Sequence, residues 1–501
     1  MGEIPASEAV IDIGSNSVRL VVFGGPVRAP ITIFNEKRLC GLGRREGEDG
    51  RLTDQAMDMA FGVLARFKSV LREMGSPPVT VVATAAIREA SNGADFIRRV
   101  ETLGFSPQIL TGKEEARYAA LGVLSGAPDI VLNSPSARSH LCGDMGGGSL
   151  ELVRYSDDFE NPIAKAGSYP LGPLRLIADY GPLLSDAEKP VAKILKNCDW
   201  LTTEKIAELH AVGGAWRALA RIHQAVHHYP LQTLHHYVMT RDEVSDICRL
   251  IEQQSPESLG QIPGMQRRRI DTLPHAAMVL RLLVEVTKTK SVIISSFGVR
   301  EGVLYDKLSK QQKIQDPLYA IAEEYARRLA PQPEAGARYF SFLNGLFTDE
   351  NPAQRRLRRA ASMMVDIAAL SHPDMRIEQG YGTVLRAPLV GLTHGERVSL
   401  AAVIYYRYRA KPGELPARMP SGIIGEEEIL WAKRLGLALR FAADLSPKSG
   451  ACLHDCKFDM RGETLVFILP HAMKTLFSPM VQKRLDLLAE VFGKPLEIRF
   501  Y

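Results

Sequence analysis

Two short stretches of the sequence share an Asp, a Gly and a Ser in the same order and at the same spacing. Residues 10–22 read Val-Ile-Asp-Ile-Gly-Ser-Asn-Ser-Val-Arg-Leu-Val-Val, and residues 142–154 read Cys-Gly-Asp-Met-Gly-Gly-Gly-Ser-Leu-Glu-Leu-Val-Arg. An Asp, a Gly and a Ser recur at a constant offset of 132 residues. In each copy a short apolar run leads into a turn of Gly, Ser or Asn, and a second β-rich run follows. This pattern predicts a β-hairpin in each copy.

The turns of these two hairpins have the composition of phosphate-binding turns. Glycine lets the backbone approach a ligand closely, and successive N–H groups in a tight turn form a concave nest for phosphate oxygens. Asp12 and Asp144 lie on the leading strands, where a carboxylate can hold Mg²⁺, usually through water, beside those phosphates. One such turn alone is more typical of a purely structural turn. Two turns at a fixed internal register predict phosphate binding by two related domains that face each other.

A pair of carboxylates, Glu114 and Glu115, stands at the start of a predicted helix, after Thr111-Gly112-Lys113. Acidic side chains in a first helical turn are stabilised by the helix dipole, by about 0.3–1 kcal/mol, which explains both residues structurally. The alternative is that one carboxylate points into a cleft between the domains and takes a proton from water that attacks phosphorus. The residues alone leave both interpretations open.

Arginines and histidines supply further candidates. Arg19 and Arg88 follow candidate phosphate-binding turns, and the planar guanidinium of arginine donates two hydrogen bonds at once to a phosphate. Ion pairing at the surface is the alternative for both arginines. Five histidines crowd residues 223–236, but the helix-spaced pair His223 and His227 has no acidic or Cys partner nearby in a metal-site pattern. We interpret these histidines as structural.

The elements that must position these residues alternate between β-rich and helical patterns up to about residue 310, which predicts an α/β architecture. The expected elements are strands over 79–84 and 107–110, helices over 94–102, 113–124 and 216–225, and a strand, turn and helix over 291–305. From about 311 the apolar spacing is almost entirely helical, with helices expected over 318–329, 355–370 and 396–408. A hairpin over 457–469, a helix over 479–492 and a strand over 496–500 then predict a small α/β unit that begins near 450.

Composition excludes several classes of protein. The chain has 501 residues, of which 46% are hydrophobic and 24% charged, as in a globular protein of about three domains. No apolar run approaches the roughly 18 residues that a membrane span needs. The six cysteines are too few and too scattered for a disulfide framework. We expect a reduced, cytoplasmic protein without a membrane or a nucleic acid as its partner.

The net charge of the chain is unevenly distributed. Residues 311–501 hold 26 Lys and Arg against 21 Asp and Glu, so the whole net charge of +5 lies in this part. The excess peaks locally at Arg355, Arg356, Arg358 and Arg359. The peak is either a solvated helix face or a surface that holds a long anion, because clustered cations focus potential along a groove.

Taken together, the motifs resemble those of the exopolyphosphatase/guanosine pentaphosphatase phosphohydrolase family. The family patterns occur in the expected order: Asp-x-Gly-Ser-Asn-Ser at 12–17, Thr-Gly-x-Glu-Glu-Ala-Arg at 111–117, Asp-x-Gly-Gly-Gly-Ser-x-Glu at 144–151, Gly-Gly at 213–214, and Ser-x-x-Gly-x-Arg-Glu-Gly at 295–302. The resemblance implies an α/β fold in which two RNase H-like (actin-like ATPase) domains surround a cleft, followed by an all-helical HD-like domain and a small C-terminal α/β unit. The corresponding domains are 1–125, 126–310, 311–449 and 450–501.

The resemblance also implies an activity and a set of site residues. The activity is processive, Mg²⁺-dependent hydrolysis of the terminal phosphoanhydride of inorganic polyphosphate, with release of orthophosphate. Glu115 becomes the general base, and Asp12, Asp144 and Glu151 become the metal ligands. The expected phosphate-binding residues belong to three glycine-bearing or serine-bearing turns and include two arginines: Ser15, Asn16, Ser17, Arg19, Arg88, Gly146, Gly147, Gly148, Ser149, Gly213 and Gly214. A monovalent cation such as K⁺ is a second candidate cofactor, and longer family members imply a homodimer.

The helical domain resembles the His-Asp metal phosphohydrolases only in part. Val365-Asp366 stands where the ligand dipeptide is expected, without its histidine, and the downstream histidines are scattered at His372 and His394. We therefore expect no second catalytic metal centre, and we interpret the positive charge of this part as a passive track for the substrate.

Three alternatives to polyphosphate hydrolysis remain open. The first is hydrolysis of guanosine pentaphosphate, because the motifs do not separate these two substrates. The second is a sugar-kinase-like or chaperone-like ATPase, because the fold is shared among these functions. The third is a non-catalytic sensor of polyphosphate or of the alarmone.

Overall fold

The computed structural model describes residues 4–501 except 44, 47–49, 128–136, 204, 410–418, 421, 448 and 461. The chain forms two compact units, Ile4–Gln315 and Asp316–Tyr501. The sequence predicts a transition near residue 310, where the α/β pattern gives way to helical spacing. The finer division into four domains stays a prediction.

The first lobe of unit Ile4–Gln315 is built on a five-stranded sheet with the spatial order β3-β2-β1-β6-β7. The strands are β1 (Ala6–Ile13), β2 (Ser17–Gly24), β3 (Ile31–Leu39), β6 (Val79–Ala83) and β7 (Pro107–Ile109). The first three pair antiparallel, and β6 and β7 continue the sheet parallel to β1. One face of the sheet is covered by α1 (Asp54–Glu73) and α3 (Gly93–Glu101), whose apolar residues recur at helical spacing and are buried.

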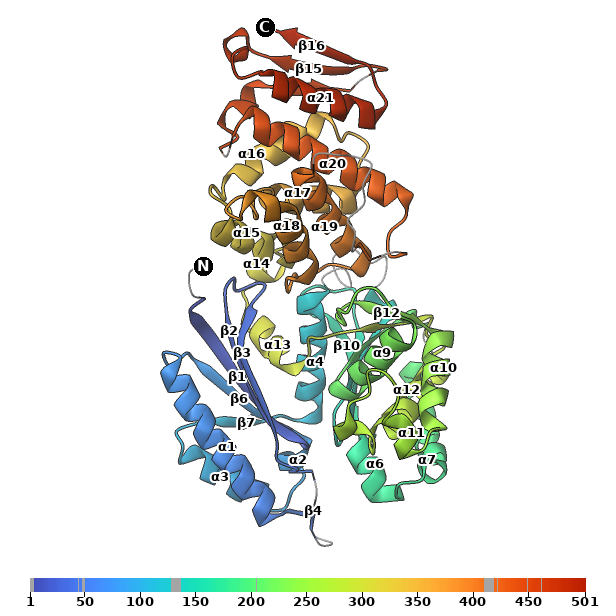
Figure 1. The fold of residues 1–501 in the computed structure, drawn as a ribbon. Coiled ribbons are helices and arrows are strands. Elements are labelled where there is room, and N and C mark those ends of the chain that lie inside the picture. Colours follow the sequence, from blue (N-terminus) through green and yellow to red (C-terminus); the bar gives the residue numbers. More distant parts are fainter. Residues whose placement is uncertain are drawn as a thin grey trace. The chain divides into compact units, whose positions relative to one another are not determined.

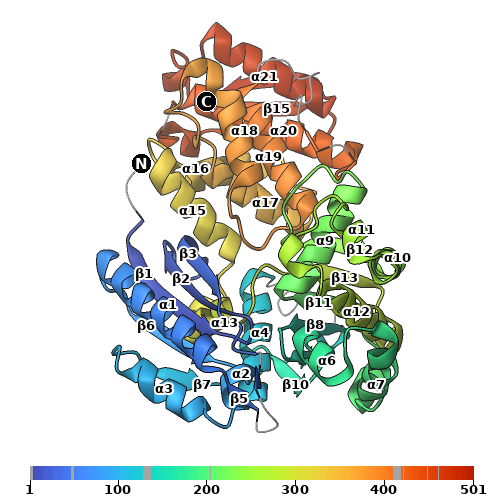
Figure 2. The same cartoon turned by 60° about the horizontal axis from the view of Figure 1, so that its bottom comes forward.

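The second lobe repeats this topology. Its sheet has the order β10-β9-β8-β11-β13-β12, so its first five strands match those of the first lobe and β12 is an addition. The strands are β8 (His140–Met145), β9 (Leu150–Tyr155), β10 (Ile163–Tyr169), β11 (Glu208–Val212), β12 (Tyr237–Thr240) and β13 (Ser291–Ile294). The helices packed on one face include α7 (Leu184–Lys196), α9 (Gly214–Val226), α10 (Arg241–Glu252) and α12 (Leu273–Thr287). Figure 2 shows them on the side of this sheet that is turned away from the first lobe.

Two helices lie between the sheets and connect the lobes (Figure 1). Helix α4 (Gly112–Gly126), which follows the strands of the first lobe, buries its apolar face against β8 and β9 of the second lobe. Helix α13 (Val299–Asp306), which follows the second sheet, packs Val303 and Leu304 on β1, β2 and β6 of the first lobe. The two helices approach so closely that a Cβ at Gly302 would lie 1.8 Å from the carbonyl oxygen of Tyr118. Only glycine permits this contact.

Unit Asp316–Tyr501 is helical up to residue 445 and ends in a small sheet. The longer helices are α15 (Pro317–Leu329), α16 (Ala335–Phe342), α17 (Pro352–Met363), α18 (Arg376–Arg386), α19 (His394–Tyr408) and α20 (Glu426–Leu445). The sheet has the order β14-β15-β16, with strands Lys457–Asp459, Leu465–Leu469 and Leu496–Phe500, and α21 (Pro479–Phe492) precedes its last strand. Phenylalanines join the two parts: Phe342 lies 5.1 Å from Phe458, and Phe441 lies 5.1 Å from Phe467, centroid to centroid. The terminal sheet therefore shares an aromatic core with the helices.

One predicted helix is shorter than expected. The apolar spacing predicts a helix over 355–370, but α17 ends at Met363 and turns follow. A side chain from another helix replaces the local bonding there: the Tyr408 hydroxyl accepts a hydrogen bond from Ala368 N–H (3.2 Å) and donates one to Val365 O (3.3 Å). Periodicity does not reveal such a tertiary bond.

The basic peak on α17 is not a continuous cationic surface. Arg358 is fully buried and donates two hydrogen bonds to the carboxylate of Glu350 (2.6 and 2.8 Å). Arg356 forms ion pairs with Asp316 and Glu396, and Arg359 stacks on the ring of Tyr319. Part of the charge of the peak is therefore neutralised inside the unit, while Arg355 and Arg359 are exposed. The interpretation of the peak as a groove for a long anion stays a prediction.

The composition predicts a chain without a disulfide framework and without a membrane span. All six cysteines of the chain are free thiols in the structure. Within the part of the chain that the structure describes, no helix is both long enough and apolar enough to cross a membrane.

Candidate active site

Both predicted hairpins are present and share one register. Asp12 on β1 lies opposite Arg19 on β2, and Asp144 on β8 lies opposite Glu151 on β9. The two copies of the motif, 132 residues apart in the sequence, therefore form a structural repeat. At equivalent positions the first lobe carries a cation, Arg19, and the second carries a carboxylate, Glu151.

The turns of the two hairpins close with the same backbone hydrogen bond. Gly14 N–H donates to Ser17 O over 3.0 Å, and Gly146 N–H donates to Ser149 O over 2.9 Å. Each turn thereby holds its intervening backbone in a tight curve, which is the geometry that presents successive N–H groups on one side.

The two turns meet across the cleft between the lobes. A Cβ at Gly148 would lie 3.1 Å from Ser15 Oγ, and a Cβ at Gly147 would lie 3.8 Å from Asn16 Cβ. A cavity of about 790 Å³ opens beside them. The predicted site residues that line it come from both lobes: Asp12, Ser15, Asn16, Ser17, Arg19, Glu115, Asp144, Gly146, Gly147, Gly148, Ser149, Glu151, Gly213 and Gly214. The structure thus brings these residues together around one cavity, including the two turns of the doubled pattern.

The structure separates the two neighbouring carboxylates of α4. Glu114 closes a capping box with Thr111, whose N–H and hydroxyl both donate to Glu114 Oε2 (2.7 and 2.8 Å). These hydrogen bonds hold the pKa of Glu114 below its ordinary value. Glu115 is instead buried, with 8% of its surface exposed, and its side chain lines the cavity. A structural role at the helix start thus holds for Glu114, with a capping box in addition to the helix dipole, and Glu115 has the location that a base acting in the cleft requires.

Burial controls the protonation of Glu115. Loss of solvent raises its pKa to about 7, and the guanidinium of Arg88, which donates to Glu115 Oε2 over 3.1 Å, opposes the rise. Arg88 also donates to Leu110 O over 2.7 Å. The structure thus places Arg88 against the predicted base, and Arg88 is absent from the residues that line the cavity.

The Gly213–Gly214 turn brings the N-terminus of α9 into the same cavity. Gly213 has φ of +103°, a backbone conformation that favours glycine, and a Cβ there would lie 2.4 Å from Met145 O. Helix α9 begins at Gly214, and both glycines line the cavity. The N–H groups and the dipole at a helix N-terminus attract anions, so this turn adds positive potential beside the two hairpin turns.

Four carboxylates in the cavity have raised pKa values, in each case mainly because burial removes solvent from the charged form. The pKa of Asp144 rises to about 6, that of Glu115 to about 7, that of Asp12 above its ordinary value and that of Glu151 well above it. Repulsion between the carboxylates adds to the effect. Asp12 raises the pKa of Asp144, and both Asp12 and Asp144 raise the pKa of Glu115. A divalent cation relieves such crowding, and carboxylate oxygens are the donors that Mg²⁺ prefers. The donor set therefore fits Mg²⁺.

Two cations that line the cavity, Arg217 and Arg300, are not among the site residues predicted from the sequence. Arg300 Nε lies 3.8 Å from Asp12 Oδ2, and the charge of Arg217 lowers the pKa of Asp144. Both arginines line the cavity, and Arg217 donates to Ser296 O over 3.0 Å. Arg300 is part of the Ser-x-x-Gly-x-Arg-Glu-Gly motif, so the motif could have predicted it as a site residue. Arg217 lies in the first turn of the helix that follows Gly213–Gly214, and this position could have predicted it.

The doubled RNase H-like topology, with two lobes around a cleft, is the fold of the actin-like ATPase superfamily. More specifically, residues 21–311 match the model of the Ppx/GppA phosphatase family, and residues 318–499 match the model described as exopolyphosphatase, C-terminal. The chain belongs to the Ppx/GppA phosphatase family. The predicted class of enzyme, a hydrolase acting on phosphorus-containing anhydrides, is thereby confirmed.

Relatives and solved structures agree with this assignment. Exopolyphosphatase 1 of Mycobacterium leprae is 25% identical over 322 residues, which cover 60% of this chain and 89% of that protein. Exopolyphosphatase 1 of Mycobacterium tuberculosis is 26% identical over 319 residues, covering 60% and 88% respectively. The crystal structure of the Aquifex aeolicus member of the Ppx/GppA family has a TM-score of 0.52 at 25% identity and covers 63% of this chain and all of that one. An exopolyphosphatase from Cytophaga hutchinsonii shares the fold, with a TM-score of 0.53 at 24% identity over 60% of this chain and 96% of its own.

Proposed function

We propose that the chain is an exopolyphosphatase, which hydrolyses the terminal phosphoanhydride of inorganic polyphosphate and releases orthophosphate. The observation that carries the proposal is the contact between the two hairpin turns beside a cavity that also contains the Glu115 side chain. Two phosphate-binding turns and a base in one cavity are what hydrolysis at the end of a phosphate chain requires. The names of the two mycobacterial relatives support the same activity.

Backbone groups bind the terminal phosphates in this proposal. Ser15, Asn16 and Ser17 from one turn, Gly146–Ser149 from the other, and Gly213–Gly214 surround the phosphate oxygens. Arg19 contributes positive charge from the first lobe. Phosphoryl transfer needs positioning and charge compensation more than covalent chemistry, because its transition state is loose and spreads charge over the equatorial oxygens. Donors fixed by hairpin turns provide this without rearrangement during the reaction.

Asp12, Asp144 and Glu151 are the proposed metal ligands. Their support is the raised pKa of each carboxyl, which burial and neighbouring carboxylates cause and which a cation would reverse. Mg²⁺ bound to them supplies positive charge to the phosphate oxygens as the anhydride breaks.

Glu115 is the proposed general base. It accepts a proton from a water molecule as the water oxygen attacks the terminal phosphorus. The bond from that phosphorus to the bridging oxygen breaks, and the shortened chain leaves with this oxygen and its electron pair. General-base catalysis of this kind contributes about 10²–10⁴-fold to a rate. Arg88 is a positioning residue in this scheme, because its guanidinium holds the carboxylate of Glu115 and favours its ionised form.

Guanosine pentaphosphate is the second candidate substrate. The cavity is also lined by polar and cationic side chains, among them Arg217, Arg221, Gln266 and Arg269, and by Leu234. Its volume of about 790 Å³ has room for more than a terminal phosphate, and an apolar residue among cations suits a nucleoside as well as a polyanion.

A substrate panel tests the proposal. Purified full-length chain is given long-chain polyphosphate, guanosine pentaphosphate or ATP at one Mg²⁺ concentration, and orthophosphate release is measured. We expect the highest kcat/KM on polyphosphate. A higher kcat/KM on guanosine pentaphosphate would make that nucleotide the proposed substrate. Release of orthophosphate from ATP alone would favour an ATPase. Binding of polyphosphate without release from any substrate would favour a sensor.

Three further features are proposals that rest on the family resemblance. They are a requirement for a monovalent cation such as K⁺, a homodimer, and a location in the cytoplasm.

A further inference from the structure

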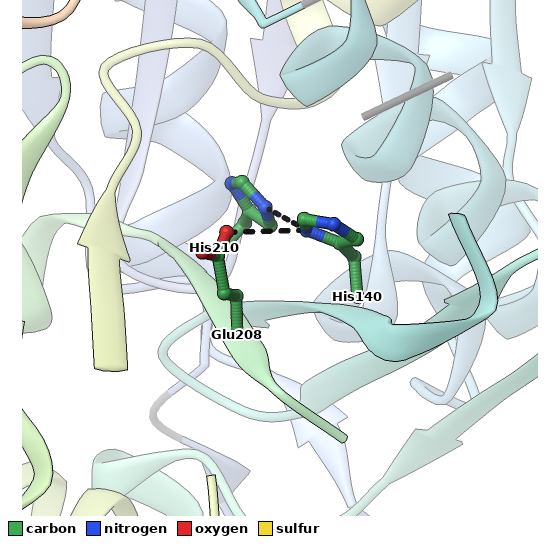
Figure 3. A group of neighbouring side chains, drawn as sticks. All are labelled: His140, Glu208 and His210. Atoms are coloured by element: carbon green, nitrogen blue, oxygen red, sulfur yellow. Dashed lines mark hydrogen bonds and ion pairs between the residues drawn. The ribbon is translucent and has the colours of Figure 1, made fainter. Parts of the chain in front are cut away.

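Two histidines and a glutamate gather at the second sheet, away from the residues of the cleft. His140 is the first residue of β8, and Glu208 is the first residue of the neighbouring parallel strand β11. The pairing places Glu208 beside His140 and His210 beside Cys142. All three side chains therefore lie on the face that α4 covers, since alternate residues of a strand share a face and Cys142 belongs to the core under α4. Figure 3 shows the three side chains converging from the two strands.

The distances among the three polar groups are those of a metal site. His140 Nδ1 lies 3.1 Å from His210 Nε2 and 3.3 Å from Glu208 Oε2, and one ligand atom from each residue falls within 4.8 Å of the others. Zn²⁺ binds nitrogen and carboxylate oxygen at about 2.0–2.1 Å in tetrahedral geometry, which separates neighbouring ligand atoms by about 3.3 Å. The two separations from His140 Nδ1 are already close to this value.

We propose that His140, Glu208 and His210 form a binding site for a Zn²⁺-like divalent cation, distinct from the Mg²⁺ ligands proposed in the cleft. Two imidazoles and one carboxylate are a known Zn²⁺ donor set that leaves a fourth position for water. The same set disfavours Mg²⁺, which prefers oxygen ligands in an octahedral arrangement. The nitrogen donors therefore separate this site from the all-carboxylate set of the cleft.

Hydrogen bonding alone satisfies this cluster less well than a cation does. A neutral imidazole nitrogen either carries one proton or has one lone pair. If His140 Nδ1 is protonated, its single hydrogen is shared between His210 Nε2 and Glu208. If His140 Nδ1 is unprotonated, it accepts a hydrogen bond from His210 Nε2, and its lone pair also faces the carboxylate of Glu208. One cation satisfies all three donor atoms at once.

The cluster is only partly shielded from solvent. His210 is buried, and the side chain of His140 is 12% exposed. The side chain of Glu208 is 38% exposed, which leaves the cluster open to solvent on one side. A metal ion in solution can therefore reach it.

The site would fasten two strands that carry catalytic groups at their other ends. His140 precedes Asp144 by four residues on β8, which corresponds to about 13 Å along a strand. Residue Val212 ends β11 immediately before the Gly213–Gly214 turn. A cation that joins β8 to β11 at their first residues stabilises this part of the sheet and takes no direct part in hydrolysis.

Metal binding to the full-length chain tests the proposal. Protein stripped of metal with a chelator is titrated with Co²⁺ and then with Zn²⁺, with bound metal measured after dialysis. We expect one equivalent of Co²⁺ with the intense visible absorption of four-coordinate geometry, displaced by Zn²⁺. We also expect Zn²⁺ at a hundredfold excess over its Kd to raise the Tm by about 5 °C.

Variants distinguish this site from other metal-binding groups. His210→Gln and His140→Gln should each weaken Zn²⁺ binding by more than about 100-fold, since loss of partners behind a ligand already costs about 10–100-fold. His227→Gln is the matched control, because it removes the exposed member of the helix-spaced pair His223 and His227. Asp144→Asn tests the cleft in the same way. Both controls should retain Zn²⁺ binding.

Two results would overturn the proposal. The first is a wild-type chain without saturable Zn²⁺ or Co²⁺ binding, in which case the cluster is a hydrogen-bonded pair with an ion-paired glutamate. The second is loss of Zn²⁺ in His227→Gln or Asp144→Asn while both cluster variants retain it. If His210→Gln does not fold, the less buried His140→Gln and the wild-type Co²⁺ spectrum carry the test.

Discussion

At the scale of single residues, the proposed mechanism depends on the difference between Glu114 and Glu115. The first is tied to Thr111 by hydrogen bonds and the second is buried in the cavity. We predict that Glu115→Gln slows polyphosphate hydrolysis by about 10²–10⁴-fold and leaves polyphosphate binding nearly intact, because only proton transfer is removed. Initial rates of orthophosphate release, together with binding to labelled polyphosphate, measure both effects.

Glu114→Gln is the control for this substitution. Glutamine also closes a capping box, so activity should stay within about twofold of the wild type. Near-normal turnover in Glu115→Gln, or a large loss in Glu114→Gln, would show that the base is misassigned.

The pH dependence of the reaction follows from the same residue. Glu115 works as a base only when ionised, so kcat/KM should fall about tenfold per pH unit below its apparent pKa. Burial raises this pKa towards about 7 from the ordinary 4.5, and Mg²⁺ nearby lowers it, so we expect the acid limb between these values. A pH profile at saturating Mg²⁺ measures it.

Substitution of Arg88 should shift the acid limb of this pH profile in one direction. Its hydrogen bond and charge lower the pKa of Glu115, so Arg88→Gln should raise that pKa and move the acid limb to higher pH. A variant whose KM rises equally at every pH, with an unmoved limb, would instead make Arg88 a phosphate ligand only.

At the scale of elements, the decisive contact is the crossing of α4 and α13 between the lobes. Gly302 on α13 meets the backbone of Tyr118 on α4, and a Cβ there would lie 1.8 Å from the Tyr118 oxygen. We predict that Gly302→Ala destabilises the chain by about 1–3 kcal/mol, because backbone must move to make room. It should also reduce kcat, because α4 carries Glu115.

Gly62→Ala is the matched control for this substitution. Gly62 lies on α1 with open space around its Cα, and alanine favours a helix over glycine by about 1 kcal/mol. Urea unfolding should therefore shift the two variants in opposite directions, and only Gly302→Ala should lower turnover. Equal stability of Gly302→Ala and the wild type would mean that the two helices do not cross as closely as described.

At the scale of the whole molecule, the chain divides into a unit that contains the cavity and a unit that carries the positive charge. All residues that line the cavity belong to Ile4–Gln315, and residues 316–501, with 25 Lys and Arg against 21 Asp and Glu, carry +4 of the chain's net charge of +5. We predict that a chain truncated after Gln315 hydrolyses short polyphosphate but loses its preference for long chains. Comparing kcat/KM across chain lengths tests this, and an unchanged dependence on length would contradict it.

Salt provides an independent measurement at the same scale. Binding of a long polyanion releases more counterions than binding of a short one, so high salt should weaken long-chain binding more in the full-length chain. The truncated chain should lose most of this difference. Because Arg358 and Arg356 are neutralised inside the unit, exposed cations elsewhere in Asp316–Tyr501 must carry the effect.

Much of the local structure was predictable because it depends on neighbours in the sequence. The hairpins at Asp12 and Asp144 follow from apolar runs that flank Gly and Ser, and the predicted helix 479–492 and strand 496–500 coincide with α21 and β16. The doubled motif also predicted two facing lobes. Backbone hydrogen bonds within a helix or a hairpin span few residues, and side-chain periodicity records which face is buried.

The repeated hairpin, the order of elements and the residue types expected at a phosphate site therefore follow from the sequence alone. Tertiary contacts were needed to show that Glu115 enters the cavity, that Arg358 is fully buried, and that His140 meets His210 across 70 residues of chain. The physical reason is that parallel strand pairing and helix crossing join residues remote in sequence. Their proximity, and the pKa shifts that burial causes, have no counterpart in any local pattern.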